Sequence, residues 1–238
     1  MKKEYTEVER EIMIRATPER VWKALTDPEE RNLWETRSCK IELKIGGTVE
    51  LDYGWGVSYK GTINELIPSS RLSIMDEHGD LTIWSLEPQQ GGTLVSIKYT
   101  GLWSGDLGIM NMENMAYGTY RFMTNLKSML EEALDKRQTF WKSWIGVNHI
   151  TAVHPEIGGV RVVQVIPDTP ASGYLQVNDI ITQINGESVN SYDQCEELIT
   201  SADPQHQLDI TYVRDGHTQT IEVITIAFGQ KLSASTSS

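Results

Sequence analysis

The stretch Gly159–Val189, GVRVVQVIPDTPASGYLQVNDIITQINGESV, decides the fold of the second part of this 238-residue chain. Its β-branched run Val160–Ile166 predicts a strand, which the following proline ends. Ile180–Ile184 predicts a second strand, which turns at the Asn-Gly pair directly after it. Between the strands, Thr169–Ser172 begins with threonine and proline, a signal for the start of a helix. The stretch therefore predicts two strands joined by a short helical connection.

These residues resemble a PDZ domain of the type that follows bacterial HtrA proteases. The motifs VIPDTPAS at 165–172 and VNDIITQING at 177–186 have the order and spacing of such domains. The resemblance implies that residues 138–229 form a partly open β-barrel with two helices. It also implies a peptide-binding function, in which a C-terminal peptide of a protein partner adds as a strand to a sheet edge beside a helix.

A loop of the form x-Φ-G-Φ presents backbone N–H groups to the peptide carboxylate in PDZ domains. Residues 144–147, Trp-Ile-Gly-Val, match this form, and the glycine keeps the approach of the peptide backbone free of a side chain. The facing helix is expected at residues 192–201. The candidate peptide-binding residues are Trp144, Ile145, Gly146, Val147, Leu198 and Ile199.

Two positions depart from the usual PDZ pattern. Trp144 is bulkier than the residue commonly found there, and the pair Asn178-Asp179 replaces a Gly-Asp turn. Asparagine tolerates the left-handed conformation, so we expect the turn to form. Leu198 and Ile199 have an alternative interpretation as core residues, because a half-buried helix needs an apolar stripe in any case.

The first part of the chain has a different order of predicted elements. Ile12 and Ile14 alternate on a strand, and the threonine-proline and aspartate-proline pairs at 17–18 and 27–28 begin two short helices. Residues 112–136 have the apolar spacing of one long helix. Alternating segments expected as strands are 40–45, 48–53, 57–67, 72–77, 81–87 and 93–99. This order predicts a six- or seven-stranded antiparallel sheet that grips a long C-terminal helix.

This order, with IRATPERVWKALTDPEE at 14–30, Trp34 and YTG at 99–101, resembles the SRPBCC or START-like superfamily. Within it, residues 8–137 are most similar to the activator of heat-shock-protein-90 ATPase homology family. The resemblance implies a helix-grip α+β fold over residues 1–137. It also implies a hydrophobic cavity between sheet and helix for lipids, polyketides or other apolar small molecules.

Aromatic, methionine and threonine side chains at inward-facing positions are the candidates to line such a cavity. They are Trp34, Trp55, Tyr59, Trp84, Tyr99, Trp103, Met110, Met115, Thr119 and Met123. The alternative is that any one of them is packed core. The glycine-containing segment 101–108 is expected as a loop and is a candidate entrance flap.

Enzymatic function is an alternative, since START-like relatives include polyketide cyclases and dehydratases, and a hydrolase is also considered. The ionisable candidates are Glu50, Asp52, Glu65, His78 and Glu113, but they form no recognisable catalytic pair, so no catalytic residue is assigned. A further alternative is a co-chaperone-like interaction module. We expect a non-enzymatic two-domain binding protein.

Charge and cysteine content narrow the classes of partner. The chain has 21 Lys and Arg against 33 Asp and Glu, a net charge of −12, which argues against nucleic acid and anionic lipid surfaces. From residue 138 onward, four basic residues face eleven acidic ones, a net charge of −7, so a peptide with basic residues upstream of its C-terminus would associate faster. Cys39 and Cys195 fall in different predicted domains, as expected for reduced thiols.

Motifs for metals, nucleotides and membranes are not found in the sequence. The five histidines and two cysteines form neither H-E-x-x-H nor C-x-x-C, so neither a metal nor a cofactor is expected. No run of about 18 apolar residues occurs, and the N-terminus MKKEYTEVERE turns acidic, which predicts a cytoplasmic protein without a membrane span. The two family resemblances imply a bacterial protein.

The predicted junction between the domains is short and aromatic. Phe140 and Trp141 lie in a segment without glycine or proline, and we expect them to dock between the domains. This leads to the hypothesis that ligand occupancy in the first domain changes peptide affinity in the second, with two independent modules as the alternative. The small polar tail at 230–238 is expected to be disordered.

Overall fold

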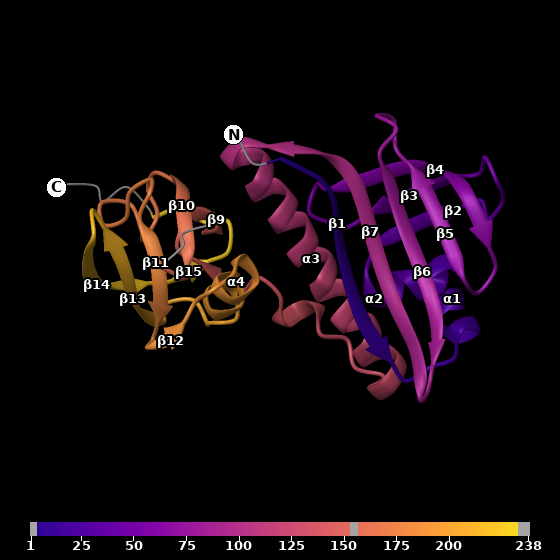
Figure 1. The fold of residues 1–238 in the computed structure, drawn as a ribbon. Helices are drawn as coiled ribbons and strands as arrows, with labels where there is room; N and C mark the ends of the chain where they lie inside the picture. The colour runs from indigo at the N-terminus through magenta and orange to yellow at the C-terminus, as the bar shows by residue number, and fades with distance from the viewer. Residues whose placement is uncertain (1–3, 153–156, 233–238) are drawn as a thin grey trace. The chain divides into compact units, whose positions relative to one another are not determined.

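The computed structural model describes residues 4–152 and 157–232 (Figure 1). By its contacts the chain divides into two compact units. Among the described residues, unit 1 comprises 4–103 and 118–137, and unit 2 comprises 104–117 and 138–232. The division falls inside one long helix, so the first part of that helix belongs to unit 2 and its second part to unit 1.

Unit 1 is built around one large antiparallel sheet. Its elements are β1 (Glu4–Ile14), α1 (Pro18–Thr26), α2 (Pro28–Trp34), β2 (Ser38–Ile41), β3 (Thr48–Asp52), β4 (Ser58–Ile67), β5 (Arg71–Met75), β6 (Leu81–Gln89), β7 (Gly92–Ser104) and the second part of α3 (Gly105–Glu132). The strand order is β1-β7-β6-β5-β4-β3-β2, and the second part of α3 runs along one face of the sheet (Figure 1). The predicted antiparallel sheet with a long helix against it is confirmed.

Local signals explain where the two short helices begin. The Thr17 side chain accepts a hydrogen bond from the Arg20 N–H, and the Asp27 carboxylate accepts from the N–H groups of Glu29 and Glu30. Proline follows each of these capping residues at the first helical position, where its missing N–H costs nothing. Both predicted helix starts are therefore found.

The prediction of a loop at 101–108 is wrong. Strand β7 continues to Ser104, and α3 begins at Gly105, well before the predicted residue 112. The reason is pairing along the sheet, since β7 lies next to the eleven-residue strand β1 and is held in the extended form. Gly105 has φ +67°, which lets the chain pass from strand to helix in one residue. The segment proposed as an entrance flap is therefore the end of a strand and the start of a helix.

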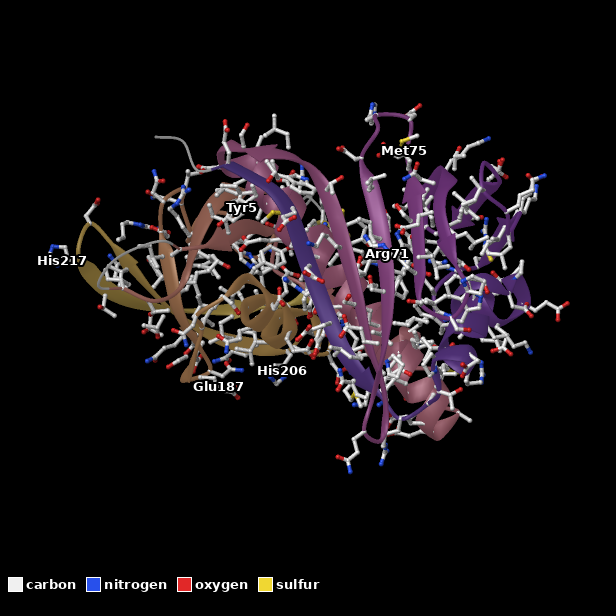
Figure 2. All side chains as sticks on the ribbon, turned by 45° about the vertical axis from the view of Figure 1, so that its right-hand side comes forward. Tyr5, Arg71, Met75, Glu187, His206 and His217 are labelled. Carbon is white, nitrogen blue, oxygen red and sulfur yellow. The ribbon has the colours of Figure 1, made fainter. Side chains whose placement is uncertain are left out.

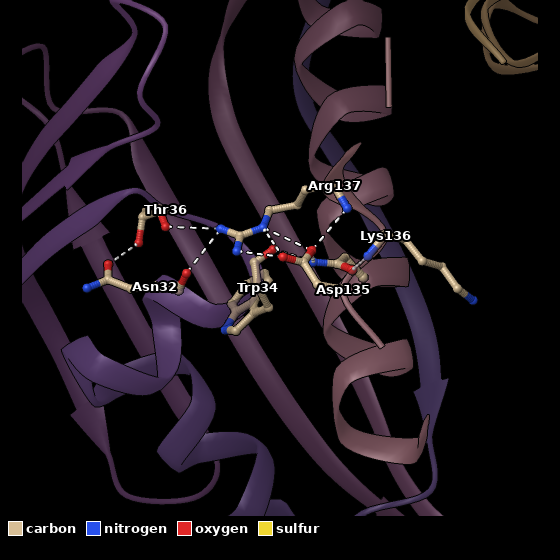
Figure 3. Close-up of polar contacts among 7 residues, drawn as sticks. Asn32, Trp34, Thr36, Asp135, Lys136 and Arg137 are labelled. Atoms are coloured by element: carbon tan, nitrogen blue, oxygen red, sulfur yellow. Dashed lines mark hydrogen bonds and ion pairs between the residues drawn. The ribbon is translucent and has the colours of Figure 1, made fainter. Parts of the chain in front are cut away.

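The C-terminal end of α3 is fixed to α2 by side chains (Figure 3). Asn125 donates to the Trp34 carbonyl over 2.8 Å, and its own carbonyl accepts from the Lys136 N–H over 2.6 Å. Arg137 Nη1 donates to the carbonyls of Asn32 and Thr36 over 3.0 and 3.2 Å. These bonds satisfy carbonyls at the end of α2, which a helix leaves without internal partners.

Unit 2 is β-rich. After the 3-10 turn η1 (Arg137–Thr139), its elements are β8 (Ser143–Trp144), β9 (Val147–Thr151), β10 (Val160–Val165), β11 (Ile180–Ile184), β12 (Glu187–Ser188), α4 (Tyr192–Thr200), β13 (Gln207–Arg214), β14 (His217–Ile224) and β15 (Ile226–Ala227). The main sheet has the order β14-β13-β11-β10-β9, with β12 paired to β11, while β15 pairs with β8. Strand β9 is thus an edge strand of the sheet (Figure 1).

The turns predicted in unit 2 are found. Asn178 has φ +78°, so asparagine adopts the left-handed conformation in place of the usual glycine. Asn185 and Gly186 both have positive φ, as the tight turn between β11 and β12 requires. The neighbouring Asp179 is buried and accepts two 2.7 Å hydrogen bonds from Arg214, which ties this turn to β13.

The helix start predicted at Thr169 is wrong, because residues 168–174 form turns. The Thr169 hydroxyl donates to the Ile166 carbonyl over 2.7 Å instead of capping a helix, and Gly173 has φ +93°. Within residues 138–232, apart from the four undescribed positions, α4 is the one α-helix. Of the predicted tail, 233–238 lie outside the described residues, and the Leu232 N–H donates to the Asp168 carbonyl over 2.7 Å.

Candidate functional site

Three of the predicted ligand-binding residues of unit 1 are packed core. Trp34 and Trp84 are almost fully buried and meet edge to face, with ring centroids 6.3 Å apart, and Met123 is fully buried. The Trp34 indole N–H donates to the Ala24 carbonyl over 2.8 Å. The Trp34 ring is thus packed against another aromatic ring, and its indole N–H has a hydrogen-bond partner. Both features fit a structural role for Trp34.

Trp55, by contrast, is 58% exposed and is the outermost member of a group of aromatic side chains. Its ring is parallel to that of Phe122, with centroids 6.2 Å apart, and Tyr53 lies 6.0 Å from each of them. Three aromatic rings, two from the segment after β3 and one from α3, therefore form one group that begins at the surface of unit 1.

Hydroxyl groups of the predicted set lie inside unit 1. Tyr99 on β7 and Thr119 on α3 share a 2.8 Å hydrogen bond between their hydroxyls. The Tyr59 hydroxyl is buried and has no hydrogen-bond partner in the part of the chain that the structure describes. Thr82 on β6 lies close to this hydroxyl but outside hydrogen-bonding geometry. Buried polar atoms normally have a partner, which makes Tyr59 a notable exception.

A buried ion pair beside these hydroxyls escaped prediction. Arg31 donates from Nε over 2.7 Å to Glu35 Oε2, its Nη2 lies 2.6 Å from the same oxygen, and its Nη1 donates to the Leu25 carbonyl over 2.9 Å. The other oxygen, Glu35 Oε1, accepts from the Tyr53 hydroxyl over 3.4 Å. The only signal in the sequence was the i, i+4 spacing of Arg31 and Glu35, which also occurs on solvent-exposed helices.

The electrostatics of this group keep its phenols protonated. Burial raises the pKa of Tyr53, Tyr59 and Tyr99, and the charge of Glu35 raises the pKa of Tyr53 and Tyr99 further. Burial alone would lower the pKa of Arg31, but the neighbouring Glu35 carboxylate raises it overall. We call these residues the tyrosine cluster: Arg31, Glu35, Tyr53, Tyr59, Tyr99 and Thr119. It offers O–H donors in a largely apolar interior.

The remaining predicted ligand-binding residues do not join this cluster. Trp103 is partly exposed near the end of β7. Met110 and Met115 are also partly exposed, and they lie on the part of α3 that belongs to unit 2. The ten predicted residues therefore divide into three core residues, three members of the tyrosine cluster, three outlying residues and the exposed Trp55. The cavity that the resemblance implies stays a prediction.

The acid and base candidates named for catalysis lie elsewhere. Glu50 pairs with Lys60 over 2.9 Å, and Glu65 pairs with Arg71 over 2.7 Å, both on partly exposed side chains. Asp52 pairs with Arg37, and His78 is exposed. Glu113 accepts a hydrogen bond within unit 2. The sequence thus pointed away from Glu35, a carboxylate that is buried in unit 1.

The predicted carboxylate-binding loop of unit 2 is built around Gly146. Its φ is +81°, and a Cβ at this position would overlap the Thr169 side chain. The loop carbonyls are in use, since the N–H groups of Ala171 and Ile166 donate to Ile145 and Gly146 over 2.9 and 2.8 Å. Among the described residues, the N–H groups of Ile145 and Gly146 donate to no acceptor. This is the arrangement that an anion-binding loop needs.

The other predicted peptide-binding residues divide between core and surface. Ile145 and Ile199 are buried in the core of unit 2, whereas Val147 and Leu198 are partly buried at its margin. Trp144 turns to the C-terminal segment, where its indole N–H donates to the Gln230 carbonyl over 2.9 Å and its ring packs on Phe228.

Three residues that meet where β9 packs on α4 were not predicted from the sequence. His149 on β9 is fully buried, and its ring stacks on Tyr192, the first residue of α4, with centroids 4.7 Å apart. Glu196, one turn further along α4, has a carboxylate oxygen 3.8 Å from His149 Nε2. The one available signal was a histidine between the β-branched residues of a short strand.

The other described histidines and cysteines are scattered. His206 and His217 lie at the surface of unit 2 (Figure 2), and His154 lies outside the described residues. Cys39 and Cys195 are free thiols, and burial raises the pKa of both. In residues 4–152 and 157–232, no group of three His, Cys, Asp or Glu side chains is placed to hold a metal ion. None of the helices described is long and apolar enough to span a membrane.

A large antiparallel sheet with a long helix against it, joined in one chain to a PDZ-like sheet, defines the class of two-domain binding or interaction proteins. Residues 15–131 match the family described as Activator of Hsp90 ATPase homolog 1-like protein, and residues 124–225 match the PDZ domain family. Both resemblances derived from the sequence are thereby confirmed.

Known structures and proteins add the following likenesses. A crystal structure of protein SSP2350 from Staphylococcus saprophyticus is 17% identical with a TM-score of 0.50, covering 55% of this chain and 96% of that one. The solution structure of the Aha1 dimer from Colwellia psychrerythraea is 21% identical with a TM-score of 0.49, covering 54% and 98%. The uncharacterized protein MJ0971 from Methanocaldococcus jannaschii is 34% identical over 56 residues, 24% of this chain but only 15% of that protein's length. The likeness to SSP2350 supports the fold.

Proposed function

We propose that unit 2 binds the free C-terminus of a partner protein in extended form along β9. The observation that carries this proposal is the position of β9, which is an edge strand and begins directly at the Trp144–Val147 loop. An edge strand offers N–H and C=O groups to a further strand, and the loop offers N–H groups to a carboxylate. The close fit of Gly146 against Thr169 supports this assignment.

The test compares peptides that differ only at their ends. The probes are fluorescein-labelled octapeptides with Lys or Arg upstream and Val, Ile, Leu or Phe at the C-terminus, each made with a free carboxylate and as an amide. Fluorescence polarisation should give a Kd near micromolar for the best free acid, a binding free energy of about −8 kcal/mol. The amide should bind at least tenfold more weakly. Equal binding of acid and amide would exclude carboxylate recognition.

We propose a second function, in which unit 1 binds an apolar small molecule that carries a hydrogen-bond acceptor such as a carbonyl. The buried, unpartnered hydroxyl of Tyr59 supports this, because a ligand acceptor would supply its missing hydrogen bond. The exposed stack of Trp55 on Phe122 supplies apolar surface nearby in sequence and fold. We favour binding over cyclase, dehydratase or hydrolase chemistry, because the Glu35 carboxylate is engaged by Arg31.

Native mass spectrometry of freshly purified protein tests this second function. We expect a retained compound that is released on denaturation, and at least tenfold less of it in Tyr59→Phe. A matched control is Tyr174→Phe, which removes a phenol hydroxyl from an exposed side chain of unit 2. Protein whose mass is that of the chain alone, after expression and after incubation with lipid extract, would remove the proposal.

We further propose that the working domains are residues 1–137 and 138–229, with 230–238 as a tail. The aromatic pair Phe140 and Trp141 follows directly on the first of these, and Phe140 is buried, with its ring edge to face on Trp141 at 5.5 Å. Expression of 1–137 alone tests the boundary. A cooperative unfolding transition should be retained, and its loss would show that residues beyond 137 are needed for folding.

A further inference from the structure

The first part of α3, residues 105–117, contacts β9 and α4 within unit 2. Glu113 Oε2 accepts a 2.9 Å hydrogen bond from the Thr151 N–H at the end of β9. Tyr117 donates to Glu197 on α4 over 2.9 Å, and its ring meets that of Tyr192 at 6.1 Å. Glu113 and Tyr117 are four residues apart, so they lie on one face of the helix.

Two further contacts hold the same helix segment. The Tyr192 hydroxyl donates to Asn114 Oδ1 over 3.1 Å. Arg161 on β10 binds the Asp106 carboxylate with two hydrogen bonds, 3.0 and 2.6 Å long. Two-pronged arginine–carboxylate contacts fix orientation as well as position. The segment is therefore anchored at both of its ends to the PDZ-like sheet and helix.

The hydrogen bond to Thr151 uses the outer edge of β9. In an antiparallel pair, successive residues direct their N–H groups alternately to the partner strand and away from it. The Ala152 N–H donates to Gly159 beside β10, so the Thr151 N–H points to the free edge. Glu113 occupies the position that the backbone of an added strand would need there.

From these contacts we infer that residues Asp106–Tyr117 cap the far end of the peptide-binding edge and restrict its ligand to the last few residues of a C-terminus. This inference rests on the proposed peptide function of unit 2. A peptide anchored by its carboxylate at Gly146 runs along β9 and reaches Thr151 after about four residues, given the strand repeat. A longer ligand pairs with Thr151 only by displacing Glu113.

The cap therefore sets a length limit on recognition. The tyrosine contacts reinforce it, because Tyr192 begins α4 and its backbone N–H donates to the Thr151 hydroxyl over 2.9 Å. The end of β9, the start of α4 and the α3 segment meet at one place. In the intact chain, residues upstream of the last four therefore add nothing to the binding affinity of a partner. The specificity of binding depends on the terminal residues.

The first measurement needs no peptide. Amide exchange at Thr151, followed by NMR in the full chain, should be at least tenfold faster in Glu113→Ala than in the wild type. Glu132→Ala is the matched control, a glutamate at the other end of the same helix that contacts Lys136. Equal Thr151 exchange in wild type and Glu113→Ala would overturn the inference, whatever the peptides do.

The second measurement compares an octapeptide with the tetrapeptide of its last four residues, both with free carboxylates. In the wild type the two should bind within twofold of each other, and in Glu113→Ala the octapeptide should gain about tenfold while the tetrapeptide stays unchanged. A tenfold advantage of the octapeptide already in the wild type would overturn the cap. If Thr151 exchange accelerates but neither peptide binds any variant, the proposed function fails and the length limit falls with it.

Discussion

The imidazole of His149 stacks on the phenol ring of Tyr192, with centroids 4.7 Å apart and ring planes 26° from parallel. Both imidazole nitrogens are buried, and neither has a hydrogen-bond partner among the residues that the structure describes, while Glu196 Oε1 lies 3.8 Å from Nε2. A neutral ring fits this place, because a protonated imidazole would lose its hydration without a full ion pair in return.

The stability of the protein should depend on the protonation of His149. Burial lowers the pKa of His149 from 6.5 to about 4. Below pH 6.5 the unfolded chain takes up a proton that the folded chain refuses, so stability is lost as the pH falls from 6.5 to about 4. The loss should be about 3 kcal/mol. Urea unfolding at several pH values measures it.

The control for this prediction is His149→Phe, which keeps an aromatic ring on Tyr192 and removes the titrating group. The variant should lose about 3 kcal/mol less than the wild type between pH 7 and pH 4, with the shared loss due to carboxylates. Parallel pH profiles for the two proteins would contradict a buried neutral histidine.

Substitution of Gly146 should be more harmful than that of another glycine with positive φ. Gly146→Ala places a Cβ against the Thr169 side chain, whereas Gly173, at φ +93°, has open space around the same position. Both alanines incur the backbone cost of about 1 kcal/mol, and Gly146→Ala should lose roughly 2 kcal/mol more and also lose peptide binding. Thermal unfolding and polarisation assays check this. Equal stability of the two variants would argue against the tight loop.

Loss of one member of the Arg31–Glu35 pair should strongly destabilise unit 1. Glu35→Gln leaves Arg31 buried without its counter-charge, which should cost about 3–5 kcal/mol. Glu65→Gln is the matched control, because its pairing with Arg71 is partly exposed and should contribute less than about 1 kcal/mol. Urea unfolding distinguishes them, and a loss of similar size in both variants would show that burial of the pair is incomplete.

Two of the three tyrosines in the cluster, Tyr59 and Tyr99, should respond in opposite ways to loss of the hydroxyl. Tyr99→Phe breaks the hydrogen bond to Thr119 and should cost about 1 kcal/mol. Tyr59→Phe removes a buried hydroxyl that has no partner and should leave the ligand-free protein unchanged or slightly more stable. Denaturant midpoints of the stripped protein test this. Equal destabilisation would mean that Tyr59 has a partner within the chain.

Local signals account for what could be predicted of the fold. Helix starts at Thr17 and Asp27 and the left-handed Asn178 each depend on residues within three or four positions, so the sequence displays the whole interaction. The helix predicted to start at Thr169 did not form. The signal for a helix start was present, but the hydroxyl found the Ile166 carbonyl in the folded chain.

The candidate sites were predicted less completely, because composition cannot separate core from contact surface. Trp34 and Trp55 are the same residue type, yet one is buried against Trp84 and the other is exposed and stacks on Phe122. The loop around Gly146 was easier to predict from the sequence, since only glycine fits the positive φ and the tight contact at this position.

By itself, the sequence determined the two domain families, the edge-strand loop around Gly146 and the capped starts of the helices, because these depend on short, ordered motifs. Only the tertiary structure decided that Arg31 and Glu35 are buried beside the tyrosines and that Glu113 meets the Thr151 N–H, 38 positions along the chain. The contacts of Glu35 with Tyr53 and of Glu113 with Thr151 join residues 18 and 38 positions apart in sequence. These contacts form only after folding has brought the two segments of the chain together, so no local sequence pattern predicts them.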